Sequence, residues 1–326
     1  MNWNKILLLA MIISSTLISI SSPSWMGMWM GMEINMVSFI PLMIKNKNNK
    51  ASQAMMIYFL TQSVGSLLLL FSILMNFITY SPFMMKLFMS LLMMSLSLKL
   101  GVAPFHMWFP EMMCNMYWLE MSILMTWQKV APLFMLSNIL NDLMFVMIIT
   151  SSVLGAIGGI NTSSIRKIMA YSSINHMSWI LMMMINQTQW YYYLFIYTIN
   201  VMMLSYYFHS NNLYFINQIP NSTITLMEKF IYSSLMLSMG GLPPFMGFLP
   251  KWMGINSMIN NKMYLIMIIM VLMSLITLFY YMRIIFPLMM NFNLMNKWNY
   301  NTNNKWITMI MFINLLLPMA SIMNFY

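Results

Sequence analysis

The segment Lys99-Leu100-Gly101-Val102-Ala103-Pro104-Phe105 interrupts a hydrophobic run that extends from about residue 84 to residue 117. As one continuous helix, those 34 residues would measure about 51 Å, whereas the hydrocarbon core of a bilayer is only about 30 Å thick. The glycine and proline predict a break in the run, because neither residue suits a helix interior. The segment therefore predicts a membrane helix that is broken near its middle and carries a lysine at the break.

A second long run, from about residue 225 to residue 258, contains a related break. Gly241-Leu242-Pro243-Pro244-Phe245 repeats the G-x-x-P-F pattern, and Lys251 follows Pro250 a few residues later. The two broken spans are five spans apart, so the predicted helices run in opposite directions through the membrane. Corresponding breaks in opposed helices are typical of transporters built from inverted repeats.

The composition of the whole chain predicts a polytopic membrane protein. Of its 326 residues, 61% are hydrophobic and only 6% are charged, which excludes a soluble domain of this size. Because lipid offers no partners to backbone polar groups, the apolar runs should form helices. We predict an all-α, inverted-repeat fold in a single transmembrane domain, 1–326. Its eleven expected spans are 4–22, 25–44, 54–76, 84–117 (interrupted), 119–139, 142–161, 164–185, 189–209, 225–258 (interrupted), 262–287 and 306–325.

The use of methionine and cysteine indicates the compartment. Packing alone does not require 50 methionines, whereas an A/T-rich gene read with a code in which ATA specifies Met would produce them. That code indicates an invertebrate mitochondrial genome, and so the mitochondrial inner membrane. The single cysteine, Cys114, excludes an internal disulfide and an all-cysteine iron–sulfur cluster.

Charges in the connections predict the orientation of the chain. One side of the predicted membrane receives most of the basic residues, and by the positive-inside rule that side is the matrix. The N-terminus should then lie in the matrix and the C-terminus, after eleven crossings, in the intermembrane space. This bias explains the net charge of +10 without a nucleic-acid partner. The basic residues on the matrix side are Lys5, Lys45, Lys47, Lys50, Arg166, Lys167, Lys229, Lys297 and Lys305.

Lys129 lies in the middle of an otherwise apolar predicted span, and Lys99 should lie at a similar depth in the preceding one. A lysine near the bilayer centre costs about 2.5–3.5 kcal/mol even on a mild insertion scale, so it needs a partner, water or a function. Snorkelling to the interface is the alternative, and it suits Lys86 or Lys262 better. We interpret Lys99, Lys129 and Lys251 as parts of an ion path.

Glu33 is the only acidic residue well inside a predicted span, and Lys99 or Lys129 is its expected counter-ion. The sequence is compatible with two interpretations of this pair: a Glu–Lys pair that switches, and a static structural pair. His176 could relay protons through water or could form a hydrogen bond within the bundle. Four other acids, Glu111, Glu120, Asp142 and Glu228, are expected to be solvated near span ends. Arg166, Lys167 and Arg283 are expected to meet lipid headgroups or partner subunits.

Other motifs carry no separate chemistry. Gly27-x-x-x-Gly31 and Gly155-Ala-Ile-Gly-Gly159 are typical of close helix packing rather than of phosphate loops. No spacing of His, Cys and carboxylate residues predicts a metal site, and no aromatic pattern specifies a quinone site. We therefore expect no metal, no cofactor and no redox centre on this chain.

Several motifs together resemble the mitochondrial NADH–ubiquinone oxidoreductase chain 2 family, insect type. The likeness runs from about residue 20 to residue 285 and keeps the order and spacing of the motifs. The motifs are Trp29-Met-Gly-Met-Glu33-Ile-Asn35, Lys99-Leu-Gly-Val-Ala-Pro-Phe-His106-Met-Trp108-Phe-Pro110, Thr126-Trp-Gln-Lys129-Val-Ala-Pro132, Gly155-Ala-Ile-Gly-Gly159, Tyr171-Ser-Ser-Ile-Asn-His176 and Gly240-Gly-Leu-Pro-Pro-Phe245 with Gly247-Phe-Leu-Pro-Lys251-Trp252.

The resemblance implies an antiporter-like fold and a proton-channel subunit in the membrane arm of respiratory complex I, a proton-translocating NADH:ubiquinone reductase. It places channel lysines at Lys99, Lys129 and Lys251, with Glu33 as the acidic partner. It also implies that FMN, iron–sulfur clusters and ubiquinone are bound elsewhere in the complex. Expected partners are other subunits, especially chains 4 and 4L, and lipids including cardiolipin. Two alternatives stay open: a stand-alone cation/proton antiporter, and a structural subunit that only bridges its neighbours.

Overall fold

The described part of the chain is helical, as the sequence predicts. The computed structural model describes residues 3–43, 49–78, 81–139, 141–219, 226–290 and 314, and among these no strand is longer than one isolated bridge, Ser164 with Phe215. The chain divides into two compact units, one up to Ser151 and one from Ser152 onward. Each unit contains one of the two G-x-x-P-F segments, so each can be described by itself.

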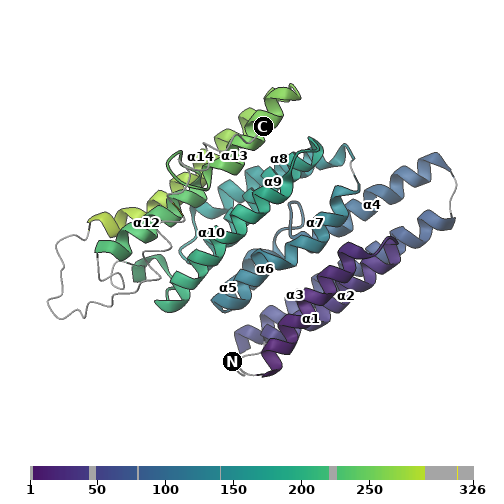
Figure 1. The fold of residues 1–326 in the computed structure, drawn as a ribbon, viewed down its shortest axis with the longest axis horizontal. Coiled ribbons are helices and arrows are strands. Elements are labelled where there is room, and N and C mark those ends of the chain that lie inside the picture. Colours follow the sequence, from purple (N-terminus) through teal and green to yellow (C-terminus); the bar gives the residue numbers. More distant parts are fainter. Residues whose placement is uncertain are drawn as a thin grey trace. The chain divides into compact units, whose positions relative to one another are not determined.

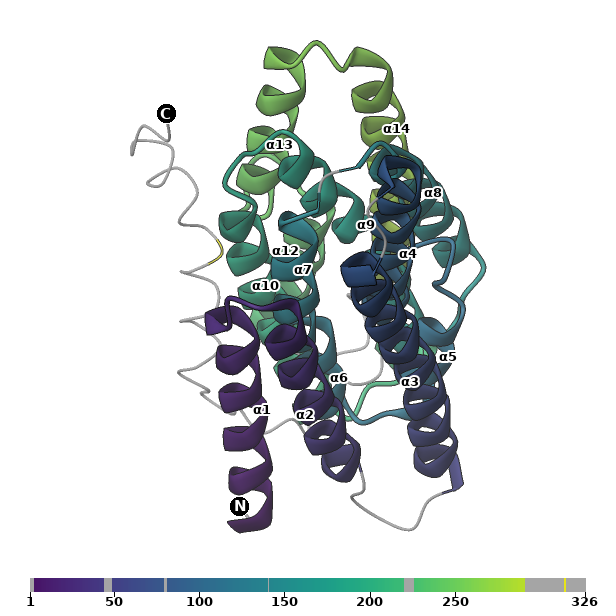
Figure 2. The ribbon, with the colours of Figure 1, turned by 90° about the vertical axis from the view of Figure 1, so that its right-hand side faces the viewer.

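The first unit begins with a helical hairpin, α1 and α2, which lie side by side (Figures 1 and 2). Helix α3 packs against α2, and it also packs against both halves of the first broken span, α4 and α5. The elements of this unit are α1 (Trp3–Ser21), α2 (Trp25–Met43), α3 (Asn49–Ile78), α4 (Pro82–Leu100), α5 (Trp108–Asn115), α6 (Trp118–Met125), the 3-10 turn η1 (Trp127–Lys129) and α7 (Val130–Ser137).

The second unit is built around α9, which is buried along nearly its whole length. The second broken span, α12 and α13, contacts α10, α9 and α14. Its elements are α9 (Ile165–Ile185), α10 (Trp190–Ser210), the 3-10 turn η2 (Ile216–Gln218), α12 (Leu226–Gly240), α13 (Phe248–Asn260) and α14 (Tyr264–Met290). Helix α8 (Leu143–Ile160) extends across the division between the units.

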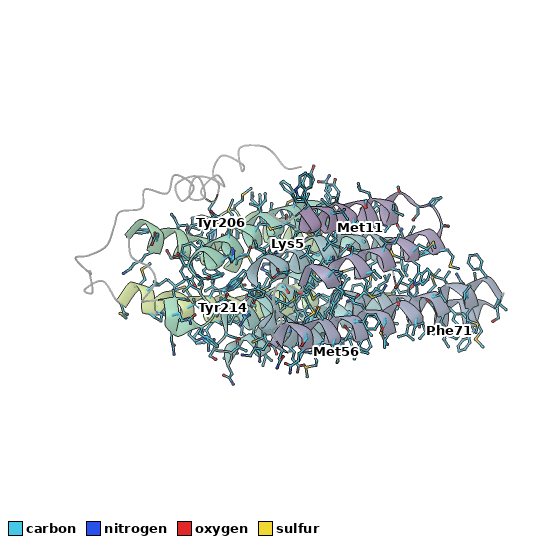
Figure 3. All side chains as sticks on the ribbon, turned by 90° about the horizontal axis from the view of Figure 1, so that it is seen from below. Lys5, Met11, Met56, Phe71, Tyr206 and Tyr214 are labelled. Carbon is cyan, nitrogen blue, oxygen red and sulfur yellow. The ribbon has the colours of Figure 1, made fainter. Side chains whose placement is uncertain are left out.

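The first ten predicted spans each correspond to a described helix or to a broken set of helices. The eleventh, 306–325, lies outside the described residues, as do Lys45, Lys47, Lys297 and Lys305. By length and composition alone, five described helices could cross a membrane unaided: α3, α4 from Phe83, α8, α9 and α14. Large apolar side chains cover the outside, among them Met11, Met56, Phe71 and Tyr206, which Figure 3 labels. Such a surface suits lipid rather than water.

The glycine motifs serve close helix packing, as predicted. A Cβ atom added at Gly31 of α2 would come within 2.8 Å of the Ser19 backbone nitrogen on α1. One added at Gly155 of α8 would come equally close to the backbone nitrogen of Asn175 on α9. These two glycines therefore let neighbouring backbones approach to distances that a side chain would prevent.

The two G-x-x-P-F breaks begin with the same helix cap. Gly101 and Gly241 have φ angles of 69° and 76°, a left-handed conformation that favours glycine. At each break the glycine N–H donates to the carbonyl three residues back, and the next N–H donates to the carbonyl five residues back. This pattern is a Schellman cap, which satisfies carbonyls at the end of a helix. In the first break the Ala103–Pro104 peptide bond is cis.

The span predicted as a continuous helix over 119–139 is broken, which corrects that expectation. Helix α6 ends at Met125, η1 follows, and α7 begins at Val130, so Lys129 lies in the 3-10 turn. The physical reason is Pro132, which has no N–H to donate to the carbonyl of Gln128 and whose ring crowds that carbonyl. Lys129 thus joins Lys99 and Lys251 as a lysine close to a helix interruption.

Arg283 was expected at headgroups or partner subunits, but it binds the chain's own backbone. From α14 its guanidinium donates one hydrogen bond to the carbonyl of Ile160 and another, 2.6 Å long, to the carbonyl of Thr162. Both carbonyls lie at the C-terminal end of α8, where a cation complements the helix dipole. Sequence could not reveal this because it requires α14 to pack beside the end of α8.

We expect Arg283→Met to destabilise the protein by about 3 kcal/mol or more, since it removes two charge-assisted hydrogen bonds. The melting temperature of the detergent-solubilised assembly that contains the chain would measure the loss. Arg283→Lys is the matched control, because it keeps the charge but not the two-pronged geometry, and it should lose about half as much. Equal melting temperatures for all three proteins would contradict the proposed contact.

Candidate functional site

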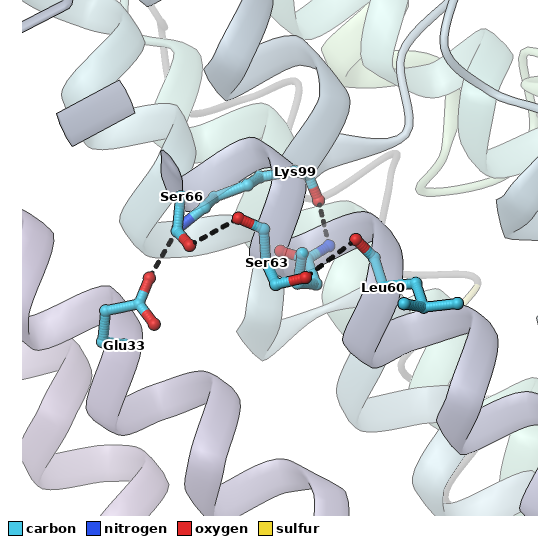
Figure 4. Close-up of polar contacts among 6 residues, drawn as sticks. Glu33, Leu60, Ser63, Ser66 and Lys99 are labelled. Atoms are coloured by element: carbon cyan, nitrogen blue, oxygen red, sulfur yellow. Dashed lines mark hydrogen bonds and ion pairs between the residues drawn. The ribbon is translucent and has the colours of Figure 1, made fainter. Parts of the chain in front are cut away.

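The first unit brings Glu33 and Lys99 together. Oε1 of Glu33 on α2 lies 3.6 Å from Nζ of Lys99, near the end of α4 (Figure 4). The Lys99 side chain is only 3% exposed, whereas that of Glu33 is 23% exposed. The separation is that of an ion pair and is longer than a direct hydrogen bond. The sequence left Lys99 and Lys129 open as counter-ions of Glu33, and the structure pairs the acid with Lys99.

Helix α3 supports Lys99 at the break. Nε2 of Gln62 donates a 3.1 Å hydrogen bond to the carbonyl of Lys99, one of the carbonyls left over where α4 ends. Gly65, one turn further along α3, faces the lysine side chain: a Cβ atom there would come within 3.0 Å of Cγ of Lys99. The hydrogen bond from Gln62 and the space left by Gly65, both on α3, thus position Lys99.

Lys129 is buried, with 4% of its surface exposed. Its ammonium lies 5.3 Å from the ring centroid of Phe109 on α5, within the range of a cation–π interaction. Two hydrogen bonds hold the residues just before it. Nε1 of Trp127 donates to Oγ1 of Thr16 on α1 at 3.2 Å, and Nε2 of Gln128 donates to Oδ1 of Asn35 on α2 at 2.9 Å.

Lys99 and Lys129 line one cavity. It offers about 30 Å³ to the centres of water molecules, and one water needs roughly 10–15 Å³ on that measure, so there is room for about two. The sequence predicted a similar depth for the two lysines, and the structure places both in the lining of this cavity. Its other polar lining residues are Asn35, Tyr58, Gln62, Trp108 and Gln128.

Lys251 lies at the second break but on its far side. Whereas Lys99 precedes Gly101 by two residues, Lys251 follows Gly241 by ten. Its Nζ reaches back from α13 and donates a 2.7 Å hydrogen bond to the carbonyl of Gly240, the last residue of α12. The lysine is 5% exposed and is therefore buried within the second unit. Here the lysine itself binds a carbonyl at the helix end.

His176 forms a hydrogen bond within the second unit. Its Nδ1 lies 2.9 Å from the hydroxyl of Tyr193 on α10, and its ring centroid is 5.0 Å from that of Tyr197. These three residues line a small cavity with Asn200, Ser238 and Pro250, the residue before Lys251. The structure therefore confirms the hydrogen-bonding interpretation of His176, while its position beside a cavity keeps the relay interpretation as a prediction.

Glu120 was expected to be solvated, and that expectation is wrong. It is 1% exposed in the first turn of α6, whereas Glu111 and Asp142 are exposed as predicted. The reason is that α6 begins inside the packed unit, where Trp118 and Met121 are equally buried. A position near the start of a span in the sequence therefore does not place a side chain in water.

Sequence reasoning missed four neutral residues of these sites: Asn35, Gln62, Gln128 and Tyr193. Asn35 and Gln128 stand beside Glu33 and Lys129 in the quoted motifs, so their polarity within apolar spans was an available signal. Gln62 and Tyr193 had no such neighbour. Among the described residues, no group of three or more His, Cys, Asp or Glu side chains could hold a metal ion.

Comparisons with known proteins agree with this geometry. The model of the family described as "NADH:quinone oxidoreductase/Mrp antiporter, TM" matches residues 22–277. The chain is 44% identical over 318 residues to NADH-ubiquinone oxidoreductase chain 2 of Aedes aegypti, covering 94% of this chain and 92% of the relative. It is 41% identical over 310 residues to the same chain of Locusta migratoria, covering 91% and 89%.

Solved structures show the fold. A chain of respiratory complex I from Thermus thermophilus with bound aureothin superposes with a TM-score of 0.83 at 16% identity, covering 99% of this chain and 79% of that one. A chain of an Mrp complex from a Dietzia species superposes with a TM-score of 0.75 at 14% identity, covering 85% and 59%. The antiporter-like fold that the resemblance implies is thereby confirmed.

Proposed function

The chain belongs to the NADH-ubiquinone oxidoreductase chain 2 family, and from this premise we propose that it is an antiporter-like subunit in the membrane arm of proton-pumping complex I. It is a multi-pass protein of the mitochondrial inner membrane and part of a proton-translocating oxidoreductase. We propose that its two units work as one membrane domain, 1–326. Within it, a proton path runs through Lys99, Lys129, Lys251 and Glu33, and His176 acts as a relay.

One observation carries this proposal: two buried lysines face the same cavity, and one of them is paired with a partly exposed carboxylate. A static structure would gain little from a second ammonium group beside the first, because like charges repel and burial disfavours both. A path that exchanges protons uses the same arrangement, since water in the cavity can connect the two amines. The loose Glu33–Lys99 distance suits a pair that forms and separates.

The proposed cycle uses redox work done elsewhere in the complex. Glu33 and Lys99 separate or pair, which changes the proton occupancy of Lys129, and Lys251 exchanges the proton with one aqueous side. Moving one charge through about 150 mV requires roughly 3.5 kcal/mol. Leaving one partner of a buried ion pair uncompensated costs up to about 3–5 kcal/mol, so the interaction between Glu33 and Lys99 can reach the required size.

The assembly and orientation of the chain complete the proposal. We propose neighbouring membrane-arm chains such as 4 and 4L as partners, together with cardiolipin. FMN, iron–sulfur clusters and ubiquinone bind elsewhere in the complex, and this chain carries the protons. The N-terminus lies in the matrix and the C-terminus in the intermembrane space. Lys5, Lys50, Arg166, Lys167 and Lys229 support this orientation by the positive-inside rule.

Glu33→Gln tests the proposed switch, because the amide keeps the shape of the side chain and removes the charge that faces Lys99. We expect coupled turnover of the assembled complex to fall about tenfold, in line with typical coupling energies between sites. NADH oxidation against a proton gradient, measured in sealed membranes, reports this loss. The control is Glu111→Gln, which neutralises an exposed acid in the same unit. Equal turnover in the two variants would reject the switch.

The second candidate function is that of a stand-alone cation/proton antiporter. It is considered because the fold is also similar to that of a chain in an Mrp complex. The purified chain in liposomes should exchange cations for protons if it is an antiporter, and should be inert or unstable if it needs its partners. A structural bridging subunit predicts instead that Lys→Met changes impair assembly and leave the turnover of assembled complex unchanged. Relatives named as chain 2 at 41–44% identity support a complex I subunit over a stand-alone antiporter.

A further inference from the structure

Helix α2 contacts both lysine sites of the first unit through residues only two positions apart. Glu33 pairs with Lys99, and Asn35 accepts a hydrogen bond from Gln128, the residue before Lys129. Residues two positions apart on a helix point to different sides of it, so α2 contacts the two sites with two different faces. A movement of α2 would therefore change the contacts at both lysine sites.

The turn that carries Lys129 depends on its side-chain anchors. It is a 3-10 turn of three residues, in which hydrogen-bond geometry is poorer than in an α-helix. Pro132 also leaves the Gln128 carbonyl without its usual helical donor. Asn35 is 4% exposed and Gln128 is half-buried, and a 2.9 Å hydrogen bond joins their side chains. Both side chains line the cavity that Lys99 and Lys129 share.

We propose that Asn35 and Gln128 are positioning residues that transmit the state of the Glu33–Lys99 pair to Lys129. This inference rests on the proposed function and adds the physical link between its two lysines. When Glu33 and Lys99 separate or pair, α2 moves relative to α4, and Asn35 moves with it. Gln128 follows its hydrogen-bond partner, which shifts the Lys129 ammonium within the cavity and relative to the Phe109 ring. Both linking residues are neutral, so the link acts through position.

A double-mutant cycle tests the link, because residues that act through one another have non-additive effects. The variants are Glu33→Gln, Gln128→Met and the double variant, each in the assembled complex, with coupled turnover and the proton-to-electron ratio as readouts. We expect Glu33→Gln to reduce coupled turnover about tenfold, as above, and Gln128→Met to reduce it by a similar factor. The double variant should fall no further than the more impaired single variant, within about twofold of it.

Trp127→Phe provides the matched control. It breaks the hydrogen bond from the same turn to Thr16 of α1 and keeps the aromatic ring, so it loosens the turn without touching α2. Combined with Glu33→Gln, its effect on turnover should multiply rather than disappear. Asn35→Leu breaks the hydrogen bond between Asn35 and Gln128 from the α2 side, and it should have the same effect on turnover as Gln128→Met. It replaces that variant if the Gln128→Met complex does not assemble.

The outcomes separate this inference from the proposed function. Multiplied effects in the Glu33/Gln128 double variant would overturn the link, and would mean that Glu33 acts on Lys129 directly through its electric field. Normal turnover of Gln128→Met and Asn35→Leu would overturn it as well. Either result leaves the proton path standing if Lys129→Met lowers the proton-to-electron ratio. If Lys129→Met instead leaves the proton-to-electron ratio unchanged, the proton path itself is rejected.

Discussion

Replacement of Lys129 by Met is expected to lower the proton-to-electron ratio of the assembled complex, or to slow its turnover sharply under coupled conditions. Methionine fills similar space but cannot carry a proton. A positioned proton-transfer group typically contributes a factor of about 10²–10⁴, so proton transfer through this chain should slow by that order. The measurement is the proton-to-electron ratio of complex in sealed membranes from a cell line that assembles it normally.

Lys86→Met is the control for this experiment. Lys86 is exposed on α4, the helix that also carries Lys99, and its replacement removes one positive charge without touching the cavity. We expect the ratio for this variant to equal that of the unaltered complex. If Lys129→Met behaves in the same way, with a normal ratio and normal turnover, Lys129 is structural and the bridging-subunit interpretation becomes the better one.

Gly241→Ala is expected to destabilise the protein strongly, because two independent requirements meet at this glycine. Its φ of 76° costs an L-residue about 1–2 kcal/mol. A Cβ atom there would also lie 2.7 Å from Cδ of Lys251, which would displace the side chain that donates to the Gly240 carbonyl. Loss of that charge-assisted hydrogen bond adds about 1.5–3 kcal/mol. We expect a total destabilisation of about 3–5 kcal/mol, measured as reduced yield and melting temperature of the complex.

The neighbouring Gly240→Ala is a close control. A Cβ atom at Gly240 would meet its nearest neighbour, Leu278, at 3.6 Å, an ordinary contact distance. Gly240 is also the last residue of α12, and alanine favours a helix over glycine by up to about 1 kcal/mol. This variant should therefore assemble normally or slightly better. Equal behaviour of the two alanine variants would show that neither the left-handed backbone nor the Lys251 contact constrains the break.

Much of the fold could be predicted because it depends on local chemistry. The helix breaks near Gly101 and Gly241 follow from glycine and proline within runs too long for one crossing. The break before Val130 was missed although Pro132 is visible in the sequence, because a proline near the start of a helix is tolerated and the run had an ordinary length. Whether Pro132 ends a helix depends on how the preceding turn is held, here by Thr16 and Asn35.

The candidate site was less predictable, because its partners come from helices far apart in the sequence. Glu33 had two possible counter-ions at a similar depth, and only packing places Lys99 beside it. Arg283 and Glu120 were misassigned because their distance from a span end indicates depth and not which neighbours surround them. Arg283 meets the end of α8, and Glu120 lies in a packed interior.

The sequence by itself determined the class, the approximate positions of most helices and the charged residues that lipid would not tolerate without a reason. These features follow from transfer free energies and backbone conformation, which act on a residue and its near neighbours. Only the tertiary structure decided which groups meet: the Glu33–Lys99 pair, the cavity shared by Lys99 and Lys129, and the Asn35–Gln128 hydrogen bond. Pairing depends on how helices pack and rotate against one another. Those arrangements are set by many weak contacts, such as the approach of Gly65 to Lys99, that no single span reveals.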